Sequence, residues 1–169
     1  SVRVPLIVRP PRSLRDAWGY AGQGRSISEN VSLADLFATI CDFTGTPLPS
    51  DEETPFGAGL DSRSLVPLLR GDVSAGHGWD NEAVSQFGGT DLMIKRDALK
   101  YTFYEREGVG ETLFDLAGDP VEHRNAIDDP AYAASVERFR ARRDALGFGA
   151  AGSPGYRNAG YAAGVGVAG

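Results

Sequence analysis

The sequence is poor in the residues that carry most metal, redox and nucleophilic chemistry. Its 169 residues include one cysteine, Cys41, and two histidines, His77 and His123. A lone thiol excludes an internal disulfide framework and fits a reducing compartment, which favours a cytoplasmic location without establishing it. The two histidines stand in separate segments and lack the close Cys/His spacing of a zinc site. We therefore expect this chain to supply no metal ligand and to bind no cofactor by itself.

Long apolar runs and an excess of positive charge are also missing. No apolar run approaches the roughly 18 residues that a membrane-spanning helix needs. Aspartate and glutamate outnumber lysine and arginine by 23 to 17, which gives a formal net charge of −6 and argues against a nucleic-acid-binding surface. We therefore expect neither a membrane nor a nucleic acid as a partner. With 41% hydrophobic residues, the chain is long enough to bury a core.

The first 25 residues combine an apolar run with a basic segment. The run from Val4 to Val8 is short, branched and uncharged, which is typical of a strand buried on both faces of an α/β sheet. Such a strand needs neighbours, so we expect Ser1 to lie inside a larger domain. Residues 9–25 are rich in arginine, proline and glycine and are predicted to form a loop. Within it, Arg12 and Arg15 are candidates for the rim of a site that binds an anionic substrate.

One amphipathic helix is predicted over residues 32–44. Its apolar side chains recur at helical spacing and should form a single stripe facing the core: Leu33, Leu36, Phe37, Ile40 and Cys41. Ser32 is a suitable N-cap, Asp35 completes a pattern like a capping box, and Gly45 can end the helix. A shorter helical turn is predicted over residues 64–70. Because Cys41 belongs to the apolar stripe of the helix over residues 32–44, it is expected to be a buried structural thiol.

The second half of the chain changes to short strands. Four segments rich in aromatic and β-branched residues are separated by turn residues: 83–87, 92–96, 99–104 and 111–116. Their short connections predict a four-stranded antiparallel sheet. A helix is predicted over residues 130–146, capped by Asp129, and a tail rich in glycine and alanine follows at 147–169. By themselves, these elements predict an α+β unit that is the C-terminal part of something larger.

Three stretches carry motifs that occur together in one known family. The first is the opening strand, residues 1–11. The second joins the helix at 31–45 to Ser62–Gly71, whose SRSLVPLLRG resembles an SLxPLLxG turn. The third joins Met93–Arg96 and Lys100 to residues 112–125, where TLFDLAGDPVEHRN resembles ELYDLxxDPxExxN. In this order and spacing, the stretches resemble the C-terminal portion of sulfatases, on the choline-sulfatase and phosphonate-monoesterase side of that family.

The resemblance implies a fold and an activity. It implies the end of an alkaline-phosphatase-like α/β sheet over residues 1–75, then a small antiparallel-sheet subdomain with its helix over 76–146, and the tail at 147–169. It also implies hydrolysis of small-molecule sulfate esters by the complete enzyme, and it leaves homo-oligomerisation open. Sulfatases use formylglycine, made from the Cys or Ser of a C/S-x-P-x-R motif, beside a divalent cation that is usually calcium.

The chain departs from the family at the catalytic centre. Cys41 is followed by Asp42, Phe43 and Thr44, so it does not match C-x-P-x-R. In the family the nucleophile and the metal aspartates lie upstream, so no catalytic or metal residue is assigned here and the chain alone is predicted to be inactive. Substrate selection is the role that could carry over, with Gln86, Arg12 and Arg15 as candidates.

Two other classes of function remain open at this point. The chain could be a non-catalytic module that binds a partner through an exposed sheet edge, or one half of a split hydrolase whose N-terminal half is a separate chain. The complete enzyme could also act on phosphate or phosphonate esters, because these reactions share the scaffold. If the chain is part of a hydrolase, whole or split, the missing N-terminal catalytic portion is the expected partner.

Overall fold

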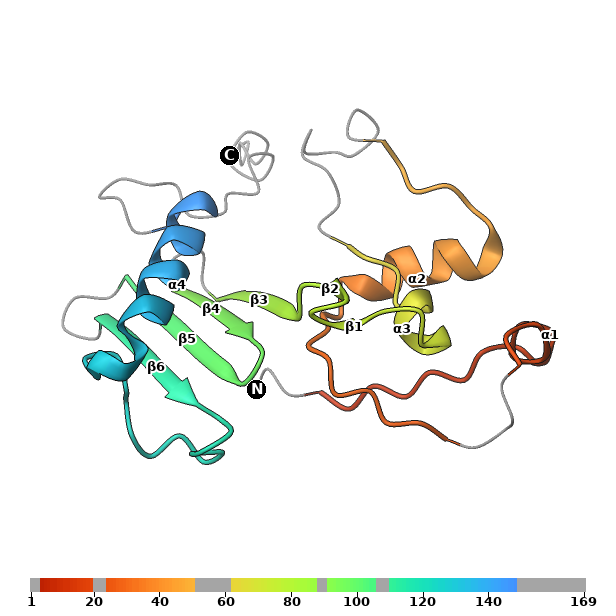
Figure 1. Cartoon of the computed structure of the whole chain (residues 1–169). Coiled ribbons are helices and arrows are strands. Elements are labelled where there is room, and N and C mark those ends of the chain that lie inside the picture. Colours follow the sequence, from red (N-terminus) through yellow and green to blue (C-terminus); the bar gives the residue numbers. More distant parts are fainter. Residues whose placement is uncertain (1–3, 20–23, 51–61, 88–90, 106–109, 149–169) are drawn as a thin grey trace, which may run out of the picture.

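The computed structural model describes residues 4–19, 24–50, 62–87, 91–105 and 110–148. These residues form two packing units that lie side by side (Figure 1). The first unit holds helices α1 (Arg12–Ala17), α2 (Asp35–Thr44) and α3 (Val66–Arg70). Two strands of two residues each, β1 (Ser74–Ala75) and β2 (Gly78–Trp79), lead from it into the second unit.

The second unit is a four-stranded antiparallel sheet. Its strands are β3 (Glu82–Phe87), β4 (Asp91–Arg96), β5 (Leu99–Tyr104) and β6 (Gly110–Asp115), in the order β3-β4-β5-β6. The predicted sheet is confirmed, with every boundary within one residue of its expected place. The β4–β5 connection is tight because Asp97 accepts a positive φ of 52°, as Asp and Asn do more readily than most residues.

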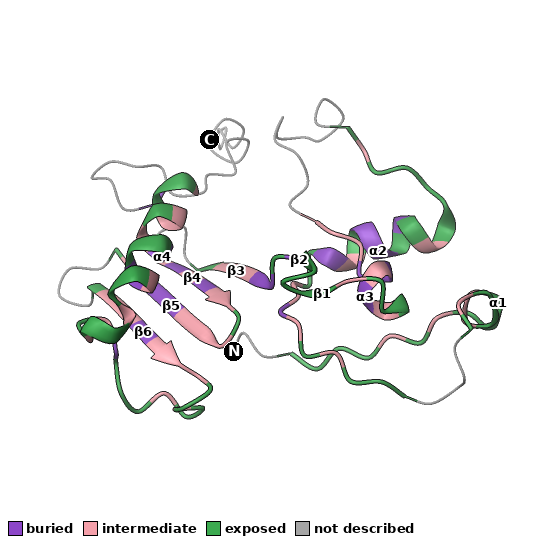
Figure 2. Ribbon diagram, viewed as in Figure 1, coloured by how far each residue is buried: buried purple, intermediate pink, exposed green. Residues whose placement is uncertain are grey.

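One helix covers one face of this sheet. A 3-10 turn at Pro130–Tyr132 (η2) leads into α4 (Ala133–Ala145), and the Asp129 side chain accepts a hydrogen bond from the Ala131 backbone N–H at 3.0 Å, as predicted. Tyr101 on β5 stacks on Phe139 of α4, with ring centroids 5.3 Å apart. Figure 2 shows that burial concentrates on β4 and β5 beneath α4. The buried side chains of this core are Leu92, Ile94, Tyr101, Leu113, Val136, Phe139 and Phe148.

The predicted tail lies outside the described residues except for Gly147 and Phe148. Phe148 is buried in the core of the sheet unit. The packed part of the chain therefore extends past the end of α4, which sequence periodicity alone did not indicate.

The first unit has a separate, smaller core. Leu65, Leu68 and Trp79 are buried there, and half-buried side chains such as Ile27 and Leu36 pack around them. This core holds α3 against α2. The burial of Cys41 is confirmed.

The predicted core-facing stripe of α2 is largely wrong. Three of its members are substantially exposed, Phe37 by 47%, Leu33 by 56% and Ile40 by 60%. The face that α2 buries instead carries Asp35, Ala38, Thr39 and Cys41. Small and polar side chains let α3 approach closely, while no described segment of this chain covers the apolar side.

Two predictions for the N-terminal residues are also corrected. Residues 4–8 form no strand, and Ile7 is 92% exposed. A strand is stabilised by ladder partners, and none of the described segments pairs with this one. The predicted loop at 9–25 contains helix α1 instead of being irregular throughout.

Helix α2 begins at Asp35, three residues later than predicted. Ser32 and Ala34 form the turn that precedes it. Asp35 Oδ2 accepts a hydrogen bond from the Ser32 backbone N–H at 2.8 Å, and Ser32 Oγ accepts one from the Ala34 N–H at 3.2 Å. The predicted N-cap is wrong, because Ala34 takes that position and α2 has no side-chain capping bond. Ser32 and Asp35 instead form their hydrogen bonds within the turn before the helix.

Candidate functional site

The two packing units are joined by polar contacts, with Arg63 at their centre. Its guanidinium lies 4.1 Å from the centroid of the Trp79 ring and forms an ion pair with Asp80. Its Nη2 also donates a hydrogen bond of 2.9 Å to the carbonyl of Glu82, the first residue of β3. The Arg63 backbone N–H donates at 2.9 Å to Asp35 at the start of α2. One side chain therefore connects the helical unit to the sheet.

Asn30 forms a second tie between the units. Its backbone N–H donates to Asn81 Oδ1 at 2.6 Å, and its side-chain amide donates to the carbonyls of Asn81 at 2.8 Å and Asp97 at 3.0 Å. Trp79 Nε1 donates to the Asn30 carbonyl at 3.1 Å, and Lys95 donates to the Asn30 side chain. Asn30 is buried, so these bonds replace water that it has lost.

A cleft of about 280 Å³ lies at this junction, on the side of the sheet that α4 covers. Gln86 lines it from β3, Arg142 and Leu146 from α4 and its end, and Arg63 from the helical unit. Ala83, Val84 and Leu92 add apolar surface. The lining of the cleft therefore combines polar groups from both units with apolar side chains.

The charges at the cleft are paired. Glu82 is 5% exposed and contacts Arg142 at 2.9 Å and Arg96 at 2.8 Å. Asp80 is paired with Arg63, as described above. Asp35 is also buried and accepts hydrogen bonds from two backbone N–H groups. It also forms an ion pair with Arg63, whose Nε lies 3.9 Å away. Three carboxylates thus meet three guanidinium groups, and the cleft has no large local excess of either charge.

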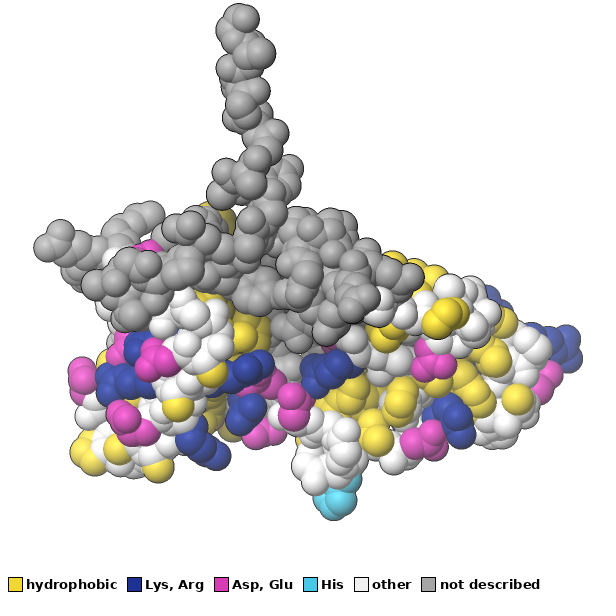
Figure 3. All heavy atoms as spheres, turned by 90° about the horizontal axis from the view of Figure 1, so that it is seen from above, with side chains coloured by type: hydrophobic (Ala, Val, Ile, Leu, Met, Phe, Trp, Pro, Cys, Tyr) yellow, Lys and Arg dark blue, Asp and Glu magenta, His cyan; other side chains and the backbone are white. Residues whose placement is uncertain are grey.

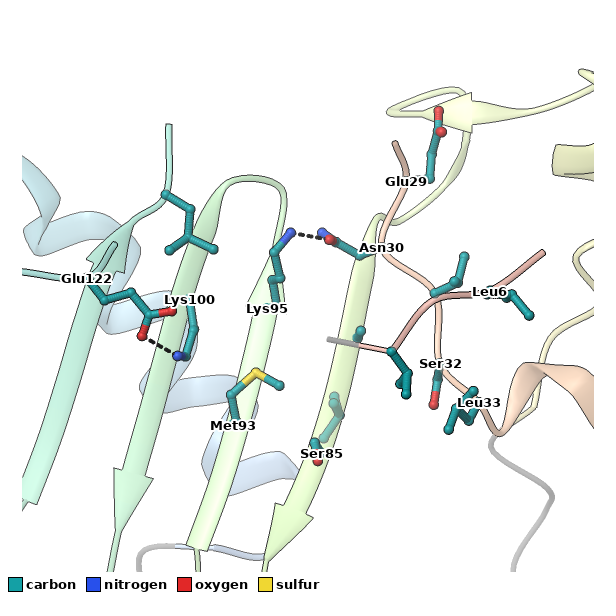
Figure 4. Close-up of a pocket in the computed structure, with 15 residues that line it drawn as sticks. Leu6, Glu29, Asn30, Ser32, Leu33, Ser85, Met93, Lys95, Lys100 and Glu122 are labelled. Atoms are coloured by element: carbon teal, nitrogen blue, oxygen red, sulfur yellow. Dashed lines mark hydrogen bonds and ion pairs between the residues drawn. The ribbon is translucent and has the colours of Figure 1, made fainter. Parts of the chain in front are cut away.

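A second and larger cleft, of about 760 Å³, lies along the opposite face of the sheet. Figure 4 shows Met93, Lys95 and Lys100 on neighbouring strands, facing a wall that includes Leu6 and Leu33. Both lysines are already engaged, Lys95 with Asn30 and Lys100 with Glu122. Because both lysines are paired, the surface that this cleft offers to a ligand is mainly apolar. It lies between the N-terminal segment and the sheet.

The structure separates the three residues predicted to bind substrate. Gln86 lines the junction cleft, whereas Arg12 and Arg15 lie on α1 and line neither this cleft nor the larger one. Among the described residues, Arg12 forms an exposed contact with Asp16, at 3.8 Å. The sequence did not single out Arg63 or Arg142. Arg63 does stand in the SRSLVPLLRG stretch, but nothing in its local pattern reveals that it reaches Trp79 and β3.

The described residues do not fit the metal ion or the modified nucleophile of a sulfatase. Among them, no three side chains of the types His, Cys, Asp and Glu come together as a metal site. Cys41 is buried on the α3-facing side of α2, away from both clefts.

No described helix has the length and hydropathy of a membrane span.

Comparison with known proteins gives relatives that include sulfatases and a phosphonate monoester hydrolase. No family model matches the chain. It is 35% identical over 119 residues to a Δ4,5-hexuronate-2-O-sulfatase of Bacteroides thetaiotaomicron, a match that covers 65% of this chain and 22% of the relative. A crystal structure assigned as a sulfatase of the same species superposes with a TM-score of 0.51 and 31% identity, over 66% of this chain and 23% of that one.

A third match has a different activity in its name. The phosphonate monoester hydrolase of Agrobacterium radiobacter superposes with a TM-score of 0.53 and 27% identity, over 72% of this chain and 25% of that one. These matches place the fold in the alkaline-phosphatase-like class. Within that class, the chain is the counterpart of the C-terminal portion of sulfatases. It spans about a quarter or less of the length of each relative described.

Proposed function

We propose that the complete protein hydrolyses sulfate esters and that this chain supplies its C-terminal portion. Residues 1–75 would be the end of the catalytic α/β domain, and residues 76–146 a small subdomain that packs beside it. The observation that carries the proposal is the 35% identity over 119 residues to a sulfatase. Two separate apolar cores support a division into two units. Trp79 crosses the proposed boundary and packs into the first core. Because that relative is named for a hexuronate, a sulfated carbohydrate is the proposed substrate class.

The chemistry of the proposed reaction belongs to residues outside this chain. A divalent cation and a formylglycine would supply charge stabilisation and the nucleophile in the complete enzyme. The described residues fit neither group, since they offer no metal cluster and Cys41 is buried in a helix interface. The role of this chain is therefore to complete the fold and to line the substrate site.

The uncovered apolar surface supports docking onto the N-terminal catalytic portion. Figure 3 shows hydrophobic side chains spread over the surface of the helical unit. The exposed apolar side chains of this unit include Ile7, Phe37 and Ile40, which are 92%, 47% and 60% exposed. Exposed apolar side chains gathered on one unit mark an interaction surface. Burial of these three would stabilise the assembly by roughly 25 cal/mol for each Å² of apolar area removed from water.

The first experiment compares this chain with the complete protein. The coding sequence upstream of Ser1 is determined, and both forms are purified and assayed on an aryl sulfate with added calcium. We expect turnover by the complete protein and none by the 169-residue chain. Turnover of the aryl sulfate by the 169-residue chain alone would refute the proposal. An upstream coding region without a C/S-x-P-x-R motif would also refute it.

A second experiment tests the docking surface. The N-terminal portion is co-expressed with this chain as a separate polypeptide, and recovery of the pair is measured by affinity capture. The double variant Phe37→Ser/Ile40→Ser should reduce capture at least tenfold. Val121→Ser is the matched control, because Val121 is 64% exposed but lies beyond β6 in the sheet unit. Equal losses for both variants would count against the α2 surface.

Phosphonate ester hydrolysis is the second candidate, and the likeness to a phosphonate monoester hydrolase favours it. The complete protein should be assayed in parallel on an aryl sulfate and an aryl phosphonate monoester. A kcat/KM higher for the sulfate keeps the first proposal, and the reverse order replaces it with the second.

A further inference from the structure

The junction cleft has the chemistry of a saccharide subsite. We infer that Gln86 and Arg142 bind the sugar ring of the substrate, at a distance from the sulfate that is cleaved. The inference rests on the proposed function for the identity of that substrate. It goes further by naming the two side chains that select the sugar and the group on the ligand that they recognise.

Gln86 and Arg142 line the cleft with polar side-chain atoms that form no hydrogen bond with the described residues. The Gln86 amide is exposed and forms no hydrogen bond with any described part of the chain. Arg142 uses its Nε on Glu82 at 2.9 Å, and its two terminal nitrogens form no bond with the described residues. The anchored Nε fixes the plane of the guanidinium. The cleft therefore presents a preset pair of donors from α4 and both a donor and an acceptor from β3.

The balance of charge distinguishes a sugar from a bare anion. Arg63, Arg96 and Arg142 are each paired with a carboxylate at or beside the cleft. A free sulfate or phosphate ion would therefore meet no net positive field. Neighbouring hydroxyl groups of a sugar ring accept and donate at once, and planar amide and guanidinium groups match that pattern without a net charge.

The shape and lining of the cleft agree with this ligand. Its volume of about 280 Å³ is near the lower end of small-molecule sites, which suits a single ring. Leu92, Leu146 and Ala83 give it apolar surface against which the C–H face of a sugar can pack. The helical unit closes one side through Arg63, so a ring bound here would contact both packing units.

The test uses the full 169-residue chain and three probes. A hexuronate-containing disaccharide, its sulfated form and inorganic sulfate are titrated while backbone and side-chain amide NMR signals are followed. We expect both disaccharides to shift the Gln86 side-chain signal and the amides around Arg142, with similar Kd values. Inorganic sulfate should shift neither. Because the probe without sulfate is included, binding is measured independently of any hydrolysis.

Matched variants assign the binding to these two residues. Gln86→Ala and Arg142→Lys should each weaken disaccharide binding by about tenfold, since each removes a hydrogen-bonding pair. Ser85→Ala on the same strand and Arg138→Lys one turn earlier on α4 are the controls, and neither residue lines this cleft.

Three results would overturn the inference: no disaccharide binding, binding that both variants leave unchanged, or competition by inorganic sulfate at the same amides. These failures are distinct from failure of the proposed function. A complete protein that hydrolyses aryl sulfates while this chain binds no saccharide would refute the subsite alone.

Discussion

Glu82 and Arg142 stand 60 residues apart in the sequence and form an ion pair of 2.9 Å between Oε1 and Nε. The contact joins the first residue of β3 to the last part of α4. Arg96 approaches the other carboxylate oxygen at 2.8 Å, so one buried carboxylate holds two strands and a helix. The same contact orients the Arg142 guanidinium at the junction cleft.

Replacing Glu82 by glutamine should destabilise the sheet unit by about 2 kcal/mol. The change leaves two guanidinium groups without their counter-charge, and their partial exposure keeps the cost below that of a fully buried pair. Urea denaturation followed by circular dichroism measures the effect. Glu137→Gln is the control, because Glu137 is exposed and, within the described part of the chain, forms a local pair with Arg140. A loss for Glu82→Gln no larger than the control's would refute the bridging role.

Protonation of Glu111 should lower the free energy of unfolding at acid pH. Burial opposes its ionisation, but hydrogen bonds from Arg140 and Tyr101 outweigh that effect and lower the pKa of Glu111 below its ordinary value of 4.5. A lowered folded-state pKa gives stabilisation that is complete above 4.5 and is lost as the pH falls through the folded-state value. The free energy of unfolding should therefore decrease steadily below pH 4.5.

The variant Glu111→Gln tests this assignment. It should lower stability at pH 7 by about 2 kcal/mol and flatten the acid slope measured by denaturation at pH 7, 5, 4 and 3. A residual slope is expected, because hydrogen bonds also lower the pKa values of Asp115 and Asp119. An unchanged acid slope in the variant would show that Glu111 does not control it.

The raised pKa of Tyr101 should lower the free energy of unfolding at alkaline pH. Burial first, and then its hydrogen bond and proximity to Glu111, raise the pKa of Tyr101 well above 10. A raised folded-state pKa gives stabilisation that is complete below the unfolded value of about 10 and is lost above it. Tyr101→Phe should therefore reduce the alkaline slope between pH 9.5 and 11, and should cost about 1 kcal/mol at pH 7 through the lost hydrogen bond. Tyr104→Phe on the same strand should leave the slope in place.

Asn30 should stabilise the junction between the units. Asn30→Ala removes side-chain donors from the carbonyls of Asn81 and Asp97 in a buried setting, and we expect a loss of about 1–3 kcal/mol. Because Trp79 donates to the Asn30 carbonyl, its fluorescence should change as the junction loosens. Ser28→Ala, two residues earlier, should change neither stability nor emission. A variant with native emission and stability would show that Arg63 holds the junction without Asn30.

Local sequence determined the sheet unit. Segments rich in aromatic and β-branched residues, separated by turns such as Asp97-Ala98, predicted four strands to within one residue. Asp129 and Pro130 marked the start of the 3-10 turn, and α4 begins three residues later than predicted, at Ala133. These signals operate between neighbouring residues, so no distant contact was needed to identify them.

Tertiary contacts decided which faces became cores. Helical periodicity grouped Leu33, Phe37 and Ile40 on one side of the predicted helix, but it could not show whether another segment covers that side. Leu33 in fact lies in the turn before α2, and all three side chains are substantially exposed. The opening run at 4–8 failed as a strand for the same reason, because a strand requires a partner. Periodicity specifies which side chains lie together, whereas burial depends on what packs against them.

The candidate site depended on the fold more than any other feature. Sequence reasoning proposed Gln86, which lines the cleft, while Arg142 and Arg63 stood out only when β3, α4 and the helical unit met. Charge pairing between residues far apart in the chain leaves no periodic signal. The sequence by itself therefore determined the local elements and the family resemblance, and the tertiary structure decided which polar groups share a cleft, because only folding brings distant segments within hydrogen-bonding distance.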